Sequence, residues 1–225
     1  ENKEFINDFK VNIDKIDKSL LDSNEYILLA NKYNNVKREN TKYDYKKLGD
    51  FIEENKSKAK NQMLPVWSVS NKIGFINTEN YHSEKVASSD IKNYKVIDKN
   101  YFAYNPSRIN VGSIALNQTE DIGCVSPMYV SFKITRPNEL NEEYLLTLLK
   151  SDEFKNIINN EASGAARKQL RFSDLENIEI PVPEYDEQIK IINLIKKKNN
   201  EINLLKEKID DISSEINKII DEVIM

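Results

Sequence analysis

Residues 187–224 read EQIKIINLIKKKNNEINLLKEKIDDISSEINKIIDEVI and contain neither Gly nor Pro. Apolar residues recur in this stretch at alternating spacings of three and four, the heptad pattern of a helix that buries one stripe against a second helix. Pro183 followed by Glu184 and Asp186 suits a helix start, where carboxylates are stabilised. At about 1.5 Å per residue the helix would extend on the order of 55 Å, so we expect it to project and pair. Its seam residues are Ile202, Leu205, Ile209, Ile212, Ile216, Ile219 and Val223.

The positions of Gly and Pro divide the rest of the chain. All five Gly and all six Pro residues lie between Gly49 and Pro183. We therefore interpret residues 1–43 as an N-terminal helical segment, 44–183 as a turn-rich globular domain and 184–225 as the long coiled-coil helix. The first N-terminal helix either packs on the globular domain or forms an antiparallel or intermolecular coiled coil. The evidence for this helix is the same heptad spacing of its apolar residues, which are Ile6, Phe9, Ile13, Ile16 and Leu20.

The globular domain is expected to be of the α+β class. Runs rich in β-branched and aromatic residues alternate with turn residues, and two amphipathic stretches predict helices, with Ser151 as the cap of the second. The alternating segment Ile178–Pro183 predicts an edge strand, since its prolines cannot donate to a neighbouring strand. The predicted strands are Leu64–Ser70, Tyr101–Tyr104, Val111–Leu116 and Cys124–Ile134, and the predicted helices are Glu139–Leu149 and Asp152–Glu161.

Composition narrows the class of protein. The chain has 225 residues, 39% apolar and 31% charged, which suits a folded domain with an appendage. No apolar run approaches the ~20 residues that span a bilayer, and no secretory pattern is present, so we expect no membrane association. The lone Cys124 fits a reducing cytoplasm, and one Cys with one His cannot build a Cys/His zinc site. We therefore expect a cytoplasmic protein without a metal of its own, and the family resemblance described below implies a prokaryotic one.

The charge balance limits how the chain could bind nucleic acid. Lys and Arg number 33 and Asp and Glu 37, which gives a net charge of −4. Free-standing DNA-binding domains usually carry a basic excess. Any nucleic-acid surface on this chain must therefore be a local patch or depend on a partner.

No catalytic constellation is present in the sequence. His82 has no identifiable nucleophile or partner near it in a motif. Residues 105–108, Asn-Pro-Ser-Arg, are similar to the Asn-Pro-Pro-aromatic motif of adenine methyltransferases, but they lack the second Pro and the aromatic residue. No Gly-rich loop suits a nucleotide cofactor. We predict that the chain is not an enzyme and holds no cofactor.

Two polar stretches are the candidate binding loops. Residues 162–172 hold three cations and no acid beside a small-residue turn, which would let backbone amides approach a phosphate. The second stretch, residues 105–110, combines Arg and Asn, the residue types that read guanine and adenine in the major groove. Either stretch could instead be an ordinary basic loop or a turn. The candidate DNA contacts are Arg167, Lys168, Arg171 and Gln169 in the first stretch and Arg108, Asn105 and Asn110 in the second.

Four blocks in order resemble the target recognition domain of type I restriction–modification specificity subunits. The resemblance covers about residues 44–225 and ends in the long helix. The blocks are YFAYNPSRINVGSIA at 101–115, VSPMYVSF at 125–132, SGAARKQL at 163–170, and IEIPVP at 178–183 followed by Glu187 and Gln188.

The resemblance implies a sequence-specific, non-catalytic subunit that binds double-stranded DNA. Specificity subunits of this family carry two recognition domains, each reading half of a split target, and two long helices in an antiparallel coiled coil. These helices dock modification subunits, which carry S-adenosylmethionine and the chemistry, and a restriction/translocase subunit is a further partner. ATP and Mg are likewise expected only in partner subunits. With one recognition domain and one helix, this chain resembles a half-subunit or a fragment, and a homodimer through the C-terminal helix would restore the pattern. Residues 1–33 would then be a remnant of a preceding conserved helix or a linker from a fused methyltransferase.

Two other functions remain open from the sequence. One is a structural coiled-coil protein with a protein-binding head. The other is the recognition end of a fused methyltransferase–nuclease.

Overall fold

The computed structural model describes residues 42–60, 63–78, 90–161 and 169–224. The chain divides into two units between Lys42 and Tyr43, and the description below concerns the second unit. The predicted N-terminal helices, together with His82, Arg167 and Lys168, lie outside the described residues.

The domain contains two four-stranded sheets, and the first of them is antiparallel. Its order is β2-β9-β6-β7, with β6 paired to both β9 and β7. Val, Ile, Phe and Tyr dominate these strands because their branched and aromatic side chains pack well on a pleated surface. The strands are β2 (Ile52–Glu54), β6 (Tyr101–Tyr104), β7 (Ile114–Leu116) and β9 (Val130–Ile134).

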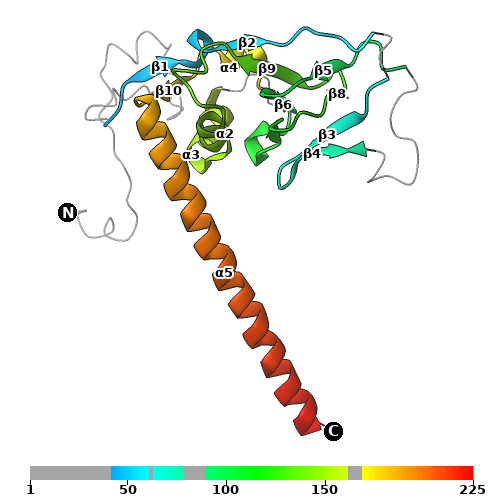
Figure 1. The fold of residues 1–225 in the computed structure, drawn as a ribbon, viewed down its shortest axis with the longest axis vertical. Coiled ribbons are helices and arrows are strands. Elements are labelled where there is room, and N and C mark those ends of the chain that lie inside the picture. Colours follow the sequence, from blue (N-terminus) through cyan, green and yellow to red (C-terminus); the bar gives the residue numbers. More distant parts are fainter. Residues whose placement is uncertain (1–41, 61–62, 79–89, 162–168, 225) are drawn as a thin grey trace, which may run out of the picture. The chain divides into compact units, whose positions relative to one another are not determined.

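A second four-stranded sheet has the order β4-β3-β8-β5, and in it β3 and β8 run parallel while the other pairs are antiparallel. A separate two-stranded sheet joins β1 (Tyr45–Lys47) to β10 (Glu179–Pro181). The domain therefore closes by pairing a segment near its start with a segment near its end (Figure 1). The strands of the second sheet are β3 (Val66–Ser70), β4 (Gly74–Asn77), β5 (Lys95–Ile97) and β8 (Gly123–Val125).

The helices pack on the first sheet and define the main core. Phe102 and Phe132 stack there with ring centroids 4.7 Å apart, and Leu145 and Leu149 of α2 are fully buried in the same cluster. Asn141 caps α2 by accepting hydrogen bonds from the backbone N–H groups of residues 143 and 144. The helices are α2 (Glu142–Lys150), α3 (Asp152–Glu161), α4 (Phe172–Leu175) and α5 (Tyr185–Ile224), with short 3-10 turns η2 (Leu48–Asp50) and η4 (Ile109–Val111).

The α+β class and the long C-terminal helix are confirmed, and several boundaries differ from the prediction. The single strand predicted over Cys124–Ile134 is wrong: the chain turns at Pro127 and Met128, where the N–H of Tyr129 donates to the Ser126 carbonyl at 3.0 Å, and β8 and β9 belong to different sheets. The strand predicted from Val111 begins only at Ile114, because Gly112 takes a left-handed conformation with φ of 83°. Ser151 caps α3 as predicted, since its hydroxyl accepts from the N–H of Phe154 at 3.2 Å.

Helix α5 is anchored to the domain by its first turns. Gln188 is fully buried: its Oε1 accepts from the N–H of Asn141 at 2.9 Å, and its Nε2 donates to the carbonyls of Glu139 and Pro183 at 2.7 and 2.8 Å. Lys196 closes the anchor with an ion pair to Glu143 at 2.6 Å. These polar groups hold the start of α5 on the cap of α2, and Ile192, buried in the main core, adds an apolar contact.

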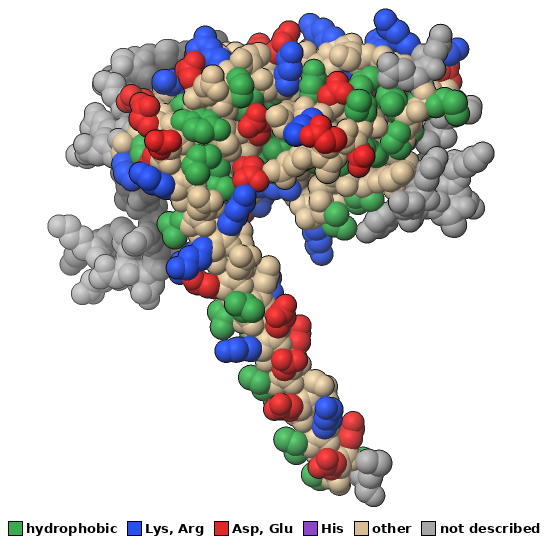
Figure 2. Space-filling view, viewed as in Figure 1, with side chains coloured by type: hydrophobic (Ala, Val, Ile, Leu, Met, Phe, Trp, Pro, Cys, Tyr) green, Lys and Arg blue, Asp and Glu red, His purple; other side chains and the backbone are tan. Residues whose placement is uncertain are grey.

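Beyond Lys196, every described residue of α5 is exposed. Figure 2 shows hydrophobic side chains along one edge of the helix and acidic side chains along the opposite edge. Ile209 and Ile219 are each 61% exposed, an unusual state for large apolar residues at regular spacing. None of the helices in the described ranges is long and apolar enough to cross a membrane.

Candidate nucleic-acid interface

The loop between β6 and β7 is closed by its own polar groups. Asn105 Oδ1 accepts from the N–H of Ser107 at 3.0 Å, and the N–H of Arg108 donates to the Asn105 carbonyl at 3.0 Å. Ile109 at the start of η4 is buried and fixes the loop to the core. The Asn105 side-chain oxygen is therefore committed to the turn, Asn110 is half-buried, and the Arg108 side chain is exposed.

The second predicted loop ends against the first. The N–H of Leu170 donates to the carbonyl of Pro106 at 3.0 Å, and the Leu170 side chain is fully buried. The next residue, Arg171, donates its own N–H to Asp174 Oδ2 at 2.9 Å at the start of α4 and leaves its side chain exposed. Gln169 is also exposed. Two loops about sixty positions apart in sequence are thus fixed to one another through their backbones.

The structure brings together part of the predicted set of DNA contacts. Arg108, Gln169 and Arg171 are exposed on the joined loops, which we call the arginine loops (residues 105–112 and 169–171). Sequence reasoning missed Pro106 and Leu170 as the residues that join them, since a backbone hydrogen bond leaves no residue-type signal.

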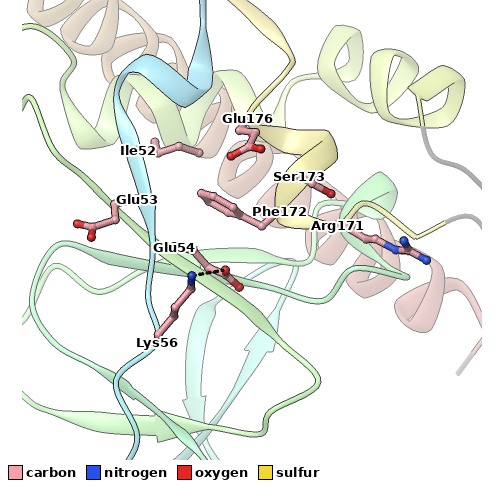
Figure 3. Close-up of a pocket in the computed structure, with 8 residues that line it drawn as sticks. All are labelled: Ile52, Glu53, Glu54, Lys56, Arg171, Phe172, Ser173 and Glu176. Carbon is pink, nitrogen blue, oxygen red and sulfur yellow. Dashed lines mark ion pairs between the residues drawn. The ribbon is translucent and has the colours of Figure 1, made fainter.

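An open pocket of about 620 Å³ lies beside Arg171 (Figure 3). Figure 3 shows Phe172 between Arg171 and the pair formed by Lys56 and Glu54, whose charged atoms are 3.9 Å apart. Three glutamates on its walls repel a phosphate, so this pocket is a poor phosphate site despite its two cations. Its walls are formed by Ile52, Glu53, Glu54, Lys56, Arg171, Phe172, Ser173 and Glu176.

Tyr104 lies under the arginine loops, at the end of β6. Its side chain is fully buried, and burial, with smaller contributions from Asp174 and Glu54, raises the pKa of its hydroxyl well above the usual range. In the described part of the chain its hydroxyl has no hydrogen-bond partner. A neutral phenol in this place supports the loops by packing, with its ring edge-on to Phe132 at 6.3 Å.

Among the described residues, the buried thiol of Cys124 is the remaining group with possible reactivity. Burial raises the pKa of the Cys124 thiol to about 11, so the thiol stays protonated and unreactive at neutral pH. Within the described ranges, no cluster of three or more His, Cys, Asp or Glu side chains could hold a metal ion.

Residues 40–214 of this chain match the model of one protein family, the "Type I restriction modification DNA specificity domain". The match covers most of the domain and the larger part of α5. The chain belongs to this family. As a specificity domain it carries three of the four resembling blocks in described segments. The first arginine loop lies in the block at 101–115, and the second consists of the last two residues of the block at 163–170 and the following Arg171.

Solved structures share the fold of this specificity domain. A chain from a study of complex assembly and conformational transition of the type I R-M system is 14% identical with a TM-score of 0.54, over 79% of this chain and 43% of that one. The HsdS subunit from Thermoanaerobacter tengcongensis is 18% identical with a TM-score of 0.53, over 72% of this chain and 43% of that one. This chain thus spans less than half the length of either. A comparison with curated proteins gives no match.

Proposed function

We propose that this chain is the sequence-specific DNA recognition subunit of a type I-like restriction–modification complex. The family match over residues 40–214 carries the proposal, and the arginine loops support it. Arg108 and Arg171 present guanidinium groups, which form bidentate hydrogen bonds to a phosphate or to the edge of a guanine. Because both loops are fixed to a buried core, little conformational freedom is lost on binding. Arg167 and Lys168, which directly precede Gln169 in the sequence, would add phosphate contacts.

Catalysis belongs to partner subunits in this proposal. The chain directs modification subunits, which hold S-adenosylmethionine, and a restriction/translocase subunit, which uses ATP and Mg, to a split target in the bacterial or archaeal cytoplasm. The net charge of −4 is compatible with this role, because partner subunits can supply most phosphate contacts while the recognition domain reads bases.

Helix α5 is the surface through which two copies of this chain would associate. Its exposed seam, which runs from Ile202 to Val223, has the spacing of a coiled coil, and burying it against another helix removes a continuous apolar stripe from water. A two-fold dimer of this chain would present two recognition domains and would therefore read a two-fold symmetric split target.

Selection from random double-stranded DNA tests the proposal. The full chain, assembled with its modification subunits, should enrich one bipartite sequence, and methylome sequencing of the source organism should show adenine methylation at that sequence only while the gene is present. The double variant Arg108→Gln/Arg171→Gln should lose the enrichment, whereas Arg136→Gln, an exposed arginine paired with Glu139, should keep it. Binding without any sequence preference would instead favour a coiled-coil protein with a protein-binding head.

A further inference from the structure

Five lysines gather where two segments distant in sequence meet. Lys58 and Lys95 form an antiparallel bridge. Around it the N–H of Ala59 donates to the Tyr94 carbonyl at 2.9 Å, and the N–H of Lys60 donates to the Lys92 carbonyl at 3.0 Å. These backbone bonds hold the two lysine-rich segments side by side. The lysine patch, as we call it, consists of Lys56, Lys58, Lys60, Lys92 and Lys95.

The patch keeps most of its positive charge. Lys56 pairs with Glu54 at 3.9 Å, and Lys95 is half-buried and donates to the Tyr129 carbonyl at 2.8 Å. Lys58 contacts the neutral amide of Asn93 at 3.3 Å. In the residues that the structure describes, no carboxylate forms an ion pair with Lys58, Lys60 or Lys92.

Several other lysines of the described surface are neutralised by carboxylates. Lys99, Lys155 and Lys198 each form an ion pair with a carboxylate, and so do Lys133 and Lys196. The exposed lysines Lys58, Lys60 and Lys92 are therefore a local cation excess on a chain with a net charge of −4.

The backbone under the patch is held in one conformation. Ala59 is fully buried in a cluster with Val96 and Cys124, so the lysines on either side of it are turned outward. Lys60 has a φ of 53°, in the left-handed region that favours glycine, and its N–H bond to the Lys92 carbonyl holds it there.

The patch continues the arginine loops. Lys56 lines the pocket that Arg171 also lines, and it lines a second pocket of about 490 Å³ with Lys58, Asn93 and Lys95. Figure 2 shows Lys and Arg side chains, with Asp and Glu side chains among them, along the edge of the domain over β2 and β5, the strands that adjoin the two segments. Lys56 thus lines both pockets and lies between Arg171 and the exposed lysines of the patch, although glutamates share the walls of the first pocket.

We propose that the lysine patch binds the phosphate backbone of double-stranded DNA beside the base pairs contacted by the arginine loops. This inference rests on the proposed function and adds a second, sequence-independent surface to it. Ammonium groups suit this role because they are compact point charges that neutralise phosphates without a fixed geometry, and each neutralised phosphate releases a bound counterion. The continuity with Arg171 favours DNA over an acidic protein as the occupant.

The test is the salt dependence of binding to a fluorescent duplex of random sequence. The variant Lys58→Gln/Lys60→Gly/Lys92→Gln removes three exposed cations, and Gly suits the left-handed conformation at position 60. The slope of log K against log salt should become shallower by about 0.9 for each phosphate that the variant no longer neutralises, or about 2.7 in all, between roughly 50 and 200 mM salt. The matched control Lys99→Gln/Lys155→Gln/Lys198→Gln changes the net charge equally and should keep the wild-type slope. Thermal melting checks that both variants are folded.

Each outcome decides the inference separately from the proposed function. An unchanged slope in the patch variant overturns the inference, as does an equal change in the control or failure of the wild-type chain to bind the duplex. Loss of association with modification subunits at an unchanged slope assigns the patch to an acidic protein partner and overturns it as well. If the slope falls as expected in the patch variant but the wild-type chain selects no sequence, the proposed function is contradicted while the inference on phosphate binding holds.

Discussion

The backbone N–H of Leu170 donates to the carbonyl of Pro106 at 3.0 Å, and this bond joins the two loops that carry Arg108 and Arg171. The Leu170 side chain is fully buried in the main core next to the bond. The position of both arginines therefore depends on an apolar residue that touches no ligand.

Replacing Leu170 with Ala should weaken DNA binding through this connection. The cavity left by the missing methyl groups should lower the free energy of unfolding by about 2–5 kcal/mol. Where the variant is still folded, its affinity for the selected sequence should fall while the Arg108 and Arg171 side chains are intact. Chemical denaturation and fluorescence anisotropy measure the two effects, and Ile122→Ala, at a half-exposed position, is the control. Unchanged affinity in a folded Leu170→Ala chain would contradict the coupling.

Removal of the Gln188 amide should loosen α5 from the domain. Gln188→Ala leaves the Asn141 N–H and the Glu139 and Pro183 carbonyls without their partner. Each of these buried groups that water cannot reach should lower the free energy of unfolding by about 1–3 kcal/mol. Gln118→Ala, which removes an exposed amide bonded to Glu143, should cost less than about 1 kcal/mol. Urea titration compares the two variants. Equal losses would show that the buried amide network does not anchor the helix.

Charges placed in the α5 seam should prevent self-association. Ile209→Asp/Ile216→Asp buries two carboxylates in any paired helix, so light scattering should give the mass of a monomer. Ser214→Asp/Asn217→Asp adds the same charge away from the seam and should leave the wild-type mass. A wild-type chain that is monomeric at all concentrations, or an unchanged mass for the seam variant, would be inconsistent with the coiled-coil pairing.

The ion pair between Lys196 and Glu143 should make stability depend on pH in the acid range. The hydrogen bond from Lys196 holds the pKa of the Glu143 carboxyl below its usual range. A carboxyl with a depressed pKa stabilises the fold above its unfolded value of about 4.3, and this contribution is lost as the pH falls through the lower folded value. Glu143→Gln should therefore be less stable than wild type at neutral pH, by less than about 1 kcal/mol because the pair is exposed, and the two should converge in acid.

Denaturation of both proteins at several pH values tests this. Glu142→Gln removes the same charge from the same helical turn and should not reproduce the trend. A constant difference from neutral to acid pH would exclude the ion pair as its source.

Gly123→Ala should disturb the second sheet, because a Cβ there would lie 2.3 Å from ring atoms of Trp67. Overpacking of this kind costs about 1–3 kcal/mol. Since Trp67 is the single tryptophan of the chain, its fluorescence reports the displacement directly. Gly112→Ala has open space around the new methyl group and strain only from its φ of 83°, so it should be destabilised without a change in tryptophan emission. Identical spectra for the two variants and wild type would contradict the packing described here.

Elements with strong local patterns were predictable, and elements defined by distant partners were not. The α3 helix and β6 follow their predicted bounds because their periodicity and caps lie within the segment itself. The three-residue strands β1, β2 and β5 were missed because each depends on pairing with a strand far along the chain. The break between β8 and β9 could have been found from Pro127, which cannot donate in a continuous ladder.

The candidate interface shows the same division. The residue types of the arginine loops, Arg108 and Arg171 among them, stand out in the sequence. The lysine patch does not, although the alternation at Lys56, Lys58 and Lys60 is a signal that could have been noticed.

By itself, the sequence determined the α+β class, the breaker-free C-terminal helix with its apolar seam, and the blocks that resemble specificity subunits. All of these depend on spacing and residue type within short windows. Only the tertiary structure decided which loops meet, because the bonds that join Pro106 to Leu170 and Lys60 to Lys92 are backbone bonds between distant segments. A backbone N–H and carbonyl are the same in almost every residue, so the residue types alone do not specify which of them pair.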